Sequence, residues 1–180
     1  MTREAVKVGI DNIKFEQGLA ESLPFVDSCF DMVVSRLAIH HFSKPELPLA
    51  EMIRACRSQG KIVIFDHVYA DDEGVFTIQN HLERLRDPSH TKGLSIVQFV
   101  RLIEKAGLEL DSIYCRNVET SLETWLNHTN TSPEHRAIIT EMLSKEIAGE
   151  GSKTGMRPFS AGENLKFLHT WALIIARVIK

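Results

Sequence analysis

The stretch FEQGLAESLPFVDSCFDMVVSRLAIHHFSKPELPLAEMIRACRSQGKIVIFD, residues 15–66, decides the fold of this chain. Residues 31–35 and 61–66 are short apolar runs, typical of strands that are buried on both faces of a parallel sheet. Between them, apolar side chains recur at helical spacing, which predicts a helix with Pro45 in its first turn and Gly60 at its end. This order of strand, helix and strand predicts a parallel pair joined by a right-handed crossover.

The flanking sequence adds further elements. Residues 1–8 look like the end of a helix that closes at Gly9, and residues 12–16 alternate apolar and polar side chains, as in a short strand. Ser95 and Gln98 form a capping box, which is the clearest helix start in the chain. We expect helices over 72–85, 95–107 and 132–149, strands over 108–115 and 165–178, and a loop over 149–158.

Composition is that of an ordinary soluble globular domain. Of the 180 residues, 43% are hydrophobic and 25% are charged, which is enough apolar material for one core. The formal net charge is -3, and Lys and Arg are interleaved with Asp and Glu, so we predict no nucleic-acid partner. No apolar run approaches the roughly 18 residues that span a bilayer, so we predict no membrane partner. Cys29, Cys56 and Cys115 are far apart and odd in number, which favours reduced thiols in a cytoplasmic protein.

The order and spacing of several segments are more informative than any one of these segments alone. They read GLAESLPF (18–25), FDMVVSRLAIHHF (30–42), KIVIFD (61–66), NHLERLRDPSHTKGLSIVQFVRLIEKAGL (80–108) and IIARV (174–178). Over nearly the whole chain they resemble class I S-adenosylmethionine-dependent methyltransferases, in the branch that includes quinone-biosynthesis methyltransferases. The resemblance implies S-adenosylmethionine as cofactor. It also implies an α/β, Rossmann-like methyltransferase fold with a mostly parallel sheet and an antiparallel last strand.

The same resemblance implies parts that this sequence does not contain. Such enzymes begin with a strand, a glycine-rich turn of the E-x-G-x-G-x-G type, a helix and a second strand that ends in an acidic residue. The ten glycines of this chain form no such cluster. We therefore expect a single partial methyltransferase domain, 1–180, that lacks the first two strands and the glycine-rich loop, with 70–95 and 116–164 as covering helical segments. We also expect a native product that is longer at its N-terminus or a truncated remnant, and self-association through an exposed sheet edge.

Two groups of residues match the family's cofactor contacts. Leu19 and Ala20 correspond to the dipeptide that receives the adenine edge; Leu19 cannot accept a hydrogen bond as the family's frequent Asp does, and the alternative is simple packing in a turn. Ser35, Arg36 and Leu37 correspond to the contact with the methionine part of the cofactor and its carboxylate. A buried Arg36 needs an anion nearby, and the alternative is an internal ion pair.

His40 and His41 follow directly and are the catalytic candidates. Methyl transfer is an in-line displacement at a sulfonium, helped by alignment and by removal of a proton from the nucleophile. Imidazole can take that proton near neutral pH, so one of the two histidines would be the base. The alternative is that a histidine before a helix caps or packs there.

A further group lies at the same rim or in the covering segment. Its members either line an acceptor pocket or tie the cover down through local hydrogen bonds and ion pairs, and they are Asp66, His67, Arg86, Asp87 and His90. We predict no metal site, because the close i, i+4 pairing of helical metal sites is missing among His40, His67, His81 and His90.

These observations predict an S-adenosylmethionine-dependent methyltransferase that acts on a small-molecule acceptor. Its cofactor half-site would be lost or supplied elsewhere, because the glycine-rich loop is absent from the sequence. The alternative is a non-catalytic binding or scaffolding fragment that keeps the second half of the fold. Binding of S-adenosylhomocysteine distinguishes the two.

Overall fold

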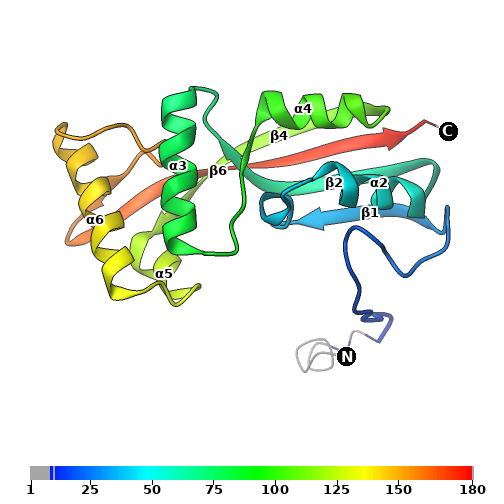
Figure 1. Cartoon of the computed structure of the whole chain (residues 1–180), viewed down its shortest axis with the longest axis horizontal. Coiled ribbons are helices and arrows are strands. Elements are labelled where there is room, and N and C mark those ends of the chain that lie inside the picture. The colour runs from blue at the N-terminus through cyan, green and yellow to red at the C-terminus, as the bar shows by residue number, and fades with distance from the viewer. Residues whose placement is uncertain (1–8, 10, 180) are drawn as a thin grey trace.

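The computed structural model describes residue 9 and residues 11–179 of the chain. Figure 1 shows an elongated molecule with β6 running along its length, α2 and α4 towards one end, and α5 and α6 towards the other. In chain order the elements are β1 (Phe30–Arg36), η1 (Ile39–His41), α2 (Glu46–Ala55), β2 (Cys56–Tyr69), α3 (Glu73–Arg86), β3 (Leu94–Ser95), α4 (Ile96–Lys105), β4 (Leu108–Ser121), α5 (Leu122–Asn127), α6 (Pro133–Ala148), β5 (Phe159–Ala161) and β6 (Asn164–Val178).

The strands form one sheet with the order β1-β2-β6-β4. β1 pairs with β2 in parallel, whereas β6 runs antiparallel between β2 and β4. The short strands β3 and β5 pair with β2 and β6, respectively. The predicted α/β fold with an antiparallel last strand is therefore confirmed.

The unit of β1, α2 and β2 forms the predicted parallel crossover. α2 buries Leu49 and Met52 against the sheet. The prediction that the helix ends at Gly60 is wrong: α2 ends at Ala55, because the segment that follows Ala55 already pairs with the start of β1. A side chain at Gly60 would lie 2.9 Å from the carbonyl oxygen of Asp31, so the glycine lets β2 approach β1 closely there.

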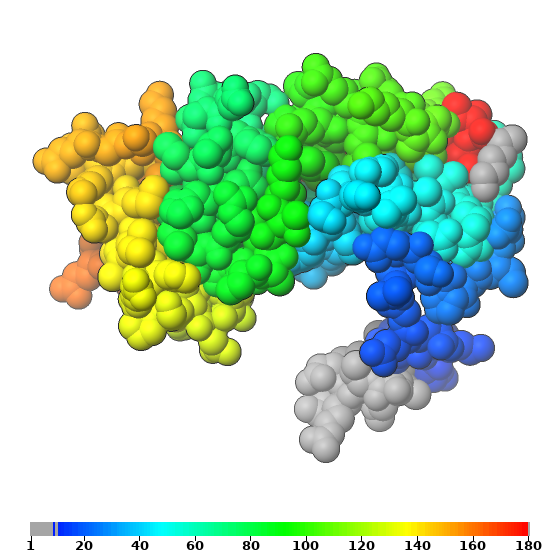
Figure 2. All heavy atoms as spheres, in the orientation of Figure 1, coloured from blue at the N-terminus to red at the C-terminus, as the bar shows by residue number. Residues whose placement is uncertain are grey.

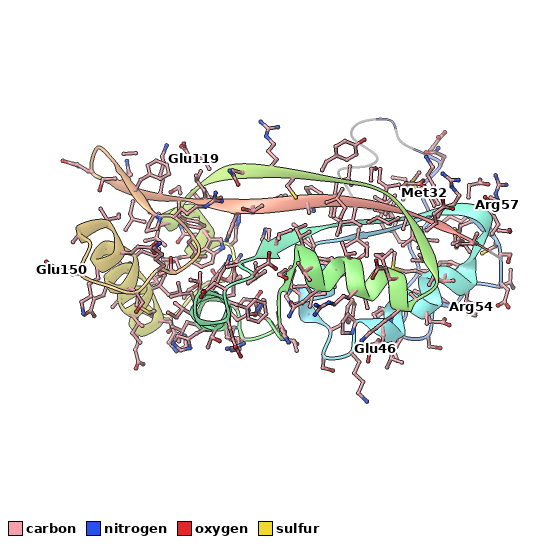
Figure 3. The ribbon with its side chains drawn as sticks, turned by 90° about the horizontal axis from the view of Figure 1, so that it is seen from above. Met32, Glu46, Arg54, Arg57, Glu119 and Glu150 are labelled. Carbon is pink, nitrogen blue, oxygen red and sulfur yellow. The ribbon has the colours of Figure 1, made fainter. Side chains whose placement is uncertain are left out.

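β1 is an edge strand, and the prediction that it is buried on both faces is wrong. It pairs with β2 on one side, and no strand in the described part of the chain pairs with its other side. Met32 and Val34 are 50% and 56% exposed. The described helices lie on the other side of the sheet from Met32, so none of them covers the outward side chains of β1 (Figure 3).

The strand predicted at 12–16 is not formed. These residues are irregular and exposed, with Phe15 at 55% exposure, and Figure 2 shows the dark blue segment to which they belong standing out from the body of the protein. A strand needs a partner for its backbone groups, and none of the described strands pairs with this segment. The helix predicted over 1–8 lies outside the described residues.

Two hydrophobic clusters hold the helices to the sheet. The first joins α2 and α4 to β2 and β6 and includes Phe99 and Ile174. The second joins α3, α5 and α6 to β6 and includes Leu82 and Phe167. Phe167 lies near the start of β6 and Ile174 near its end, so the two side chains enter different clusters. β6 is thus the strand that both clusters share.

The later elements begin largely where the sequence predicts. The capping box at Ser95 starts α4, Ser132 caps α6, and Gly149 ends α6 in the left-handed conformation. β4 continues to Ser121, beyond the predicted 108–115, because it pairs with nearly the full length of β6. The short elements α5 and β5 are not anticipated by the sequence. Among the described residues, no helix has both the length and the apolar character needed to span a bilayer.

Phe99→Ala tests the first cluster. Phe99 is 1% exposed, so the truncation removes buried contacts and leaves a cavity, and we expect the free energy of unfolding to fall by about 4 kcal/mol. Val97→Ala changes a side chain of the same helix that is 45% exposed, and should alter that free energy by no more than about 0.5 kcal/mol. Urea denaturation followed by circular dichroism measures both. Equal losses in the two variants would contradict the core position of Phe99.

Candidate functional site

The carboxyl ends of β1 and β2 lie at one edge of the sheet because the two strands are parallel. After Arg36 the chain turns sharply: Leu37 has a φ of 49° and donates its N–H to the carbonyl oxygen of Phe65 at 2.8 Å. The turn leads into η1, which carries His40 and His41. Both predicted catalytic histidines are therefore placed beside the end of β2.

Asp66 fixes His40 at this edge. The carboxylate is buried, and its Oδ1 lies 2.6 Å from Nδ1 of His40. Oδ1 also accepts the backbone N–H of His67 at 2.8 Å, and Oδ2 accepts the backbone N–H of Ile39 at 2.9 Å. A carboxylate is an acceptor, so in neutral His40 the proton is on Nδ1 and the free lone pair is on Nε2. An imidazole that is oriented in this way by a carboxylate can act as a general base.

His41 faces the covering segment instead. Its Nδ1 lies 3.0 Å from the carbonyl oxygen of Ser89 and 3.2 Å from the hydroxyl of the same residue. Thr91 donates its hydroxyl to the carbonyl oxygen of His41 at 2.8 Å, and the backbone N–H groups of Thr91 and Lys92 both donate to the carbonyl oxygen of His40. These contacts fasten the covering segment to η1. The geometry favours His40 over His41 as the catalytic candidate.

Of the three predicted residues of the covering segment, Arg86 and His90 contact distant parts of the chain and Asp87 makes local contacts. The ring centre of buried His90 lies 5.5 Å from that of His40. Arg86 places its guanidinium 4.9 Å from the ring centre of Trp125 and donates to the carbonyl oxygen of Trp125. Asp87 accepts two hydrogen bonds within its own turn. These positions fit the alternative in which the segment ties the cover down.

A pocket of about 220 Å³ lies beside the same edge. Its lining brings together Ala20, Ser35 and Arg36 with the apolar side chains of Ile39 and Met52. Three of the five predicted cofactor residues therefore share one pocket. A larger hollow of about 820 Å³ lies between α2 and α4, but none of the predicted site residues lines it, so we place the site at the smaller pocket.

The other two predicted cofactor residues lie differently. Leu19 is 71% exposed and outside the lining of the pocket, and Leu37 makes the turn after β1. Arg36 is exposed and not buried, so the predicted cost of burying its charge does not arise. Its guanidinium lies 5.9 Å from the ring centre of Phe65, and it belongs to none of the ion pairs among the described residues. It is therefore available to an anionic ligand.

A family described as a methyltransferase domain matches residues 1–107, which contain the pocket and the pair of His40 and Asp66. The chain belongs to this methyltransferase family. S-adenosylmethionine is the cofactor of the family. Within the methyltransferase domain, Ser35 and Arg36 offer polar contacts to such a ligand and Ala20 an apolar one, so the residues of the pocket fit part of the cofactor.

The chain is similar to three further proteins. The uncharacterized methyltransferase YcgJ of Bacillus subtilis is 33% identical, and the match covers 78% of this chain and 59% of that protein. Its crystal structure matches with a TM-score of 0.87 at 27% identity, covering 98% of this chain and 76% of that chain. The uncharacterized protein YafE of Escherichia coli is 30% identical over 86% of this chain and 72% of its own length. A geranyl diphosphate methyltransferase, solved in complex with S-adenosylmethionine, shares the fold at 16% identity and a TM-score of 0.55, covering 98% of this chain and 62% of that chain.

The chain also holds a buried group that the sequence did not predict. His67 of β2 meets Glu83 of α3 and His169 of β6, with 4.5 Å between the ring centres of His67 and His169. Two local signals point to this group. Glu83 directly follows the buried Leu82 on an otherwise amphipathic helix, and His169 lies two residues after the buried Phe167 on the same side of β6.

Acid will destabilise the domain partly through His90. Burial lowers the pKa of His90 from 6.5 to about 4; Glu83 opposes this shift, and the positive charges of His40, Arg84 and His41 add to it. Between these two pH values the unfolded chain binds a proton that the folded chain does not bind. Stability therefore falls as the pH decreases through this range.

His90→Gln removes this titration. We expect the loss of unfolding free energy between pH 7 and pH 5 to be smaller in the variant than in the unmodified chain by about 1 kcal/mol. Urea denaturation at the two pH values measures the difference. His128→Gln, at an exposed position, serves as the control and should keep the original pH dependence. An unchanged loss in His90→Gln would contradict the role given to His90.

Proposed function

We propose that this chain acts as an S-adenosylmethionine-dependent methyltransferase on a small-molecule acceptor, with His40 as general base. The strongest support is the buried contact of 2.6 Å between His40 Nδ1 and Asp66 Oδ1. This contact lies next to Ile39, which lines the pocket that also contains Ser35 and Arg36. The base and the cofactor residues thus share the carboxyl-terminal edge of the sheet, where ligands bind in open α/β folds.

Bound S-adenosylmethionine supplies an electrophilic methyl group. In the proposal, the guanidinium of Arg36 pairs with the carboxylate of the cofactor, since it is exposed and outside the described ion pairs. Ser35 adds a hydrogen-bonding hydroxyl, and Ala20 offers apolar contact. Leu19, which is mostly exposed, contributes only if the cofactor or another part of the protein covers it.

His40 takes up the proton that the acceptor loses. Transfer of the methyl group from bound S-adenosylmethionine would leave S-adenosylhomocysteine, and the nucleophilic atom of the acceptor would lose its proton. The proton of the acceptor passes to Nε2 of His40, which is free because Nδ1 is bonded to Asp66. The carboxylate of Asp66 then stabilises the imidazolium that results.

The proposal also includes a cytoplasmic location and self-association of the chain. Cys29 and Cys115 are free thiols, as is usual in the reducing cytoplasm. The outer edge of β1 is unpaired among the described strands and carries the half-exposed Met32 and Val34. An edge of this kind favours strand addition, so we propose self-association through β1.

Arg36→Gln tests cofactor binding. Isothermal titration with S-adenosylhomocysteine should give heat with the folded chain, and the variant should bind about tenfold more weakly because a charge-assisted contact is lost. Arg101→Gln, at an exposed position on α4, should bind as the unmodified chain does. Absence of heat with the folded chain would reject the enzyme and favour a non-catalytic binding or scaffolding fragment.

His40→Gln tests catalysis. With an acceptor found by screening small nucleophiles for release of S-adenosylhomocysteine, the variant should lose about 10²- to 10⁴-fold in kcat. Its affinity for S-adenosylhomocysteine should remain, because His40 is outside the lining of the pocket. His81→Gln, at an exposed histidine of α3, controls for the loss of an imidazole elsewhere. A larger loss in His41→Gln than in His40→Gln would reverse the assignment of the base.

A further inference from the structure

Three buried polar atoms converge beneath α3. They are Nε2 of His67, Oε1 of Glu83 and Nε2 of His169, and each is buried without a hydrogen-bond partner among the described residues. One ligand atom from each residue lies within 4.8 Å of the others. Buried polar atoms are normally paired, because an unpaired one loses its bonds to water without replacement. A shared ligand at their centre would satisfy all three at once.

An ion pair within the protein accounts for only part of this arrangement. Nε2 of His169 and Oε1 of Glu83 are 3.2 Å apart, an ion-pair distance, but they are not aligned for a hydrogen bond. Such a pair would in any case leave Nε2 of His67 alone. The three residues come from β2, α3 and β6, so the fold itself brings them together.

We propose that His67, Glu83 and His169 bind a divalent transition-metal ion of the zinc class. Two imidazoles and one carboxylate form a set of nitrogen and oxygen ligands that such ions accept, and three protein ligands leave a further coordination position open. Nε2 of His169 and Oε1 of Glu83, at 3.2 Å, have a spacing close to that of two ligands around a metal with bonds of about 2.0–2.2 Å, and ligand atoms of all three residues lie within 4.8 Å of one another. The ion would join the two strands of the sheet to α3.

Neighbouring groups orient the ligands. Arg86 lies 3.3 Å from Oε2 of Glu83, so the other oxygen of the carboxylate is held in place while Oε1 faces the histidines. Aromatic rings surround His169, with ring centres at 4.8 Å for Phe167 and 5.7 Å for Trp125. Outer contacts and an apolar surround of this kind fix the geometry of metal ligands.

Titration of the chelator-treated chain with zinc chloride tests the proposal, and needs neither cofactor nor acceptor. We expect one Zn²⁺ per chain by isothermal titration and by elemental analysis after dialysis. Glu83→Gln and His169→Gln should each weaken binding at least about tenfold. His81→Gln and His40→Gln should retain it, since His81 is exposed and His40 belongs to the pair with Asp66.

Other results would overturn the proposal. These are failure of the folded chain to bind zinc, unchanged binding in both Glu83→Gln and His169→Gln, and loss of binding in His40→Gln with retention in His169→Gln. Circular dichroism establishes that each variant is folded. If a variant is not folded, the unmodified chain provides the test: bound Co²⁺ should show d–d absorption without a thiolate charge-transfer band. A thiolate band would place the ion at a cysteine and also overturn the proposal. None of these readouts depends on methyl transfer.

Discussion

The parallel pairing of β1 with β2 is the constraint on which the functional edge depends. Parallel strands must be joined by a crossover, and α2 provides it with Leu49 and Met52 buried against the sheet. Since both strands then run the same way, their carboxyl ends meet at one edge. The turn at Leu37 and the last residues of β2 become neighbours for this reason alone, and a carboxylate on one strand can reach an imidazole that follows the other.

Histidines are concentrated at this edge and beneath α3, where burial makes the charged form of imidazole unfavourable. Two carboxylates organise them: Asp66 holds His40, and Glu83 faces His169. His67 lies between the two groups, with its ring stacked at 5.7 Å from His40 and 4.5 Å from His169. A change of charge in one group should therefore change the electrostatic energy of the other, because few water molecules can screen the interaction between buried side chains.

Local signals explain what the sequence could predict. The capping box at Ser95 and the Ser-Pro start of α6 act within a single turn of helix, so they can be recognised without knowledge of the rest of the fold. The crossover is also predictable, since the spacing of its apolar residues fixes both strands and the helix between them.

Pairing over long distances explains what the sequence could not predict. The segment 12–16 has the alternation of a strand but no described partner, and Met32 and Val34 of β1 are exposed because no described helix covers their face of the sheet. The sequence predicts His40 as a candidate base and Asp66 as a residue at the rim, but not the contact between them. The group of His67, Glu83 and His169 depends on three elements far apart in the sequence, and only the folded chain reveals it.

The pairing of β1 on one side only has a consequence for the hydrogen exchange of its backbone amides. In a parallel ladder, alternate residues direct their N–H groups to opposite sides of the strand. Leu37, just past β1, donates to Phe65 of β2, so the N–H groups of Val33 and Ser35 face β2 and those of Met32 and Val34 face the outer edge. Amide deuterium exchange along β1 would then alternate between slow and fast from one residue to the next, and anything that pairs with the outer edge would slow the fast set alone.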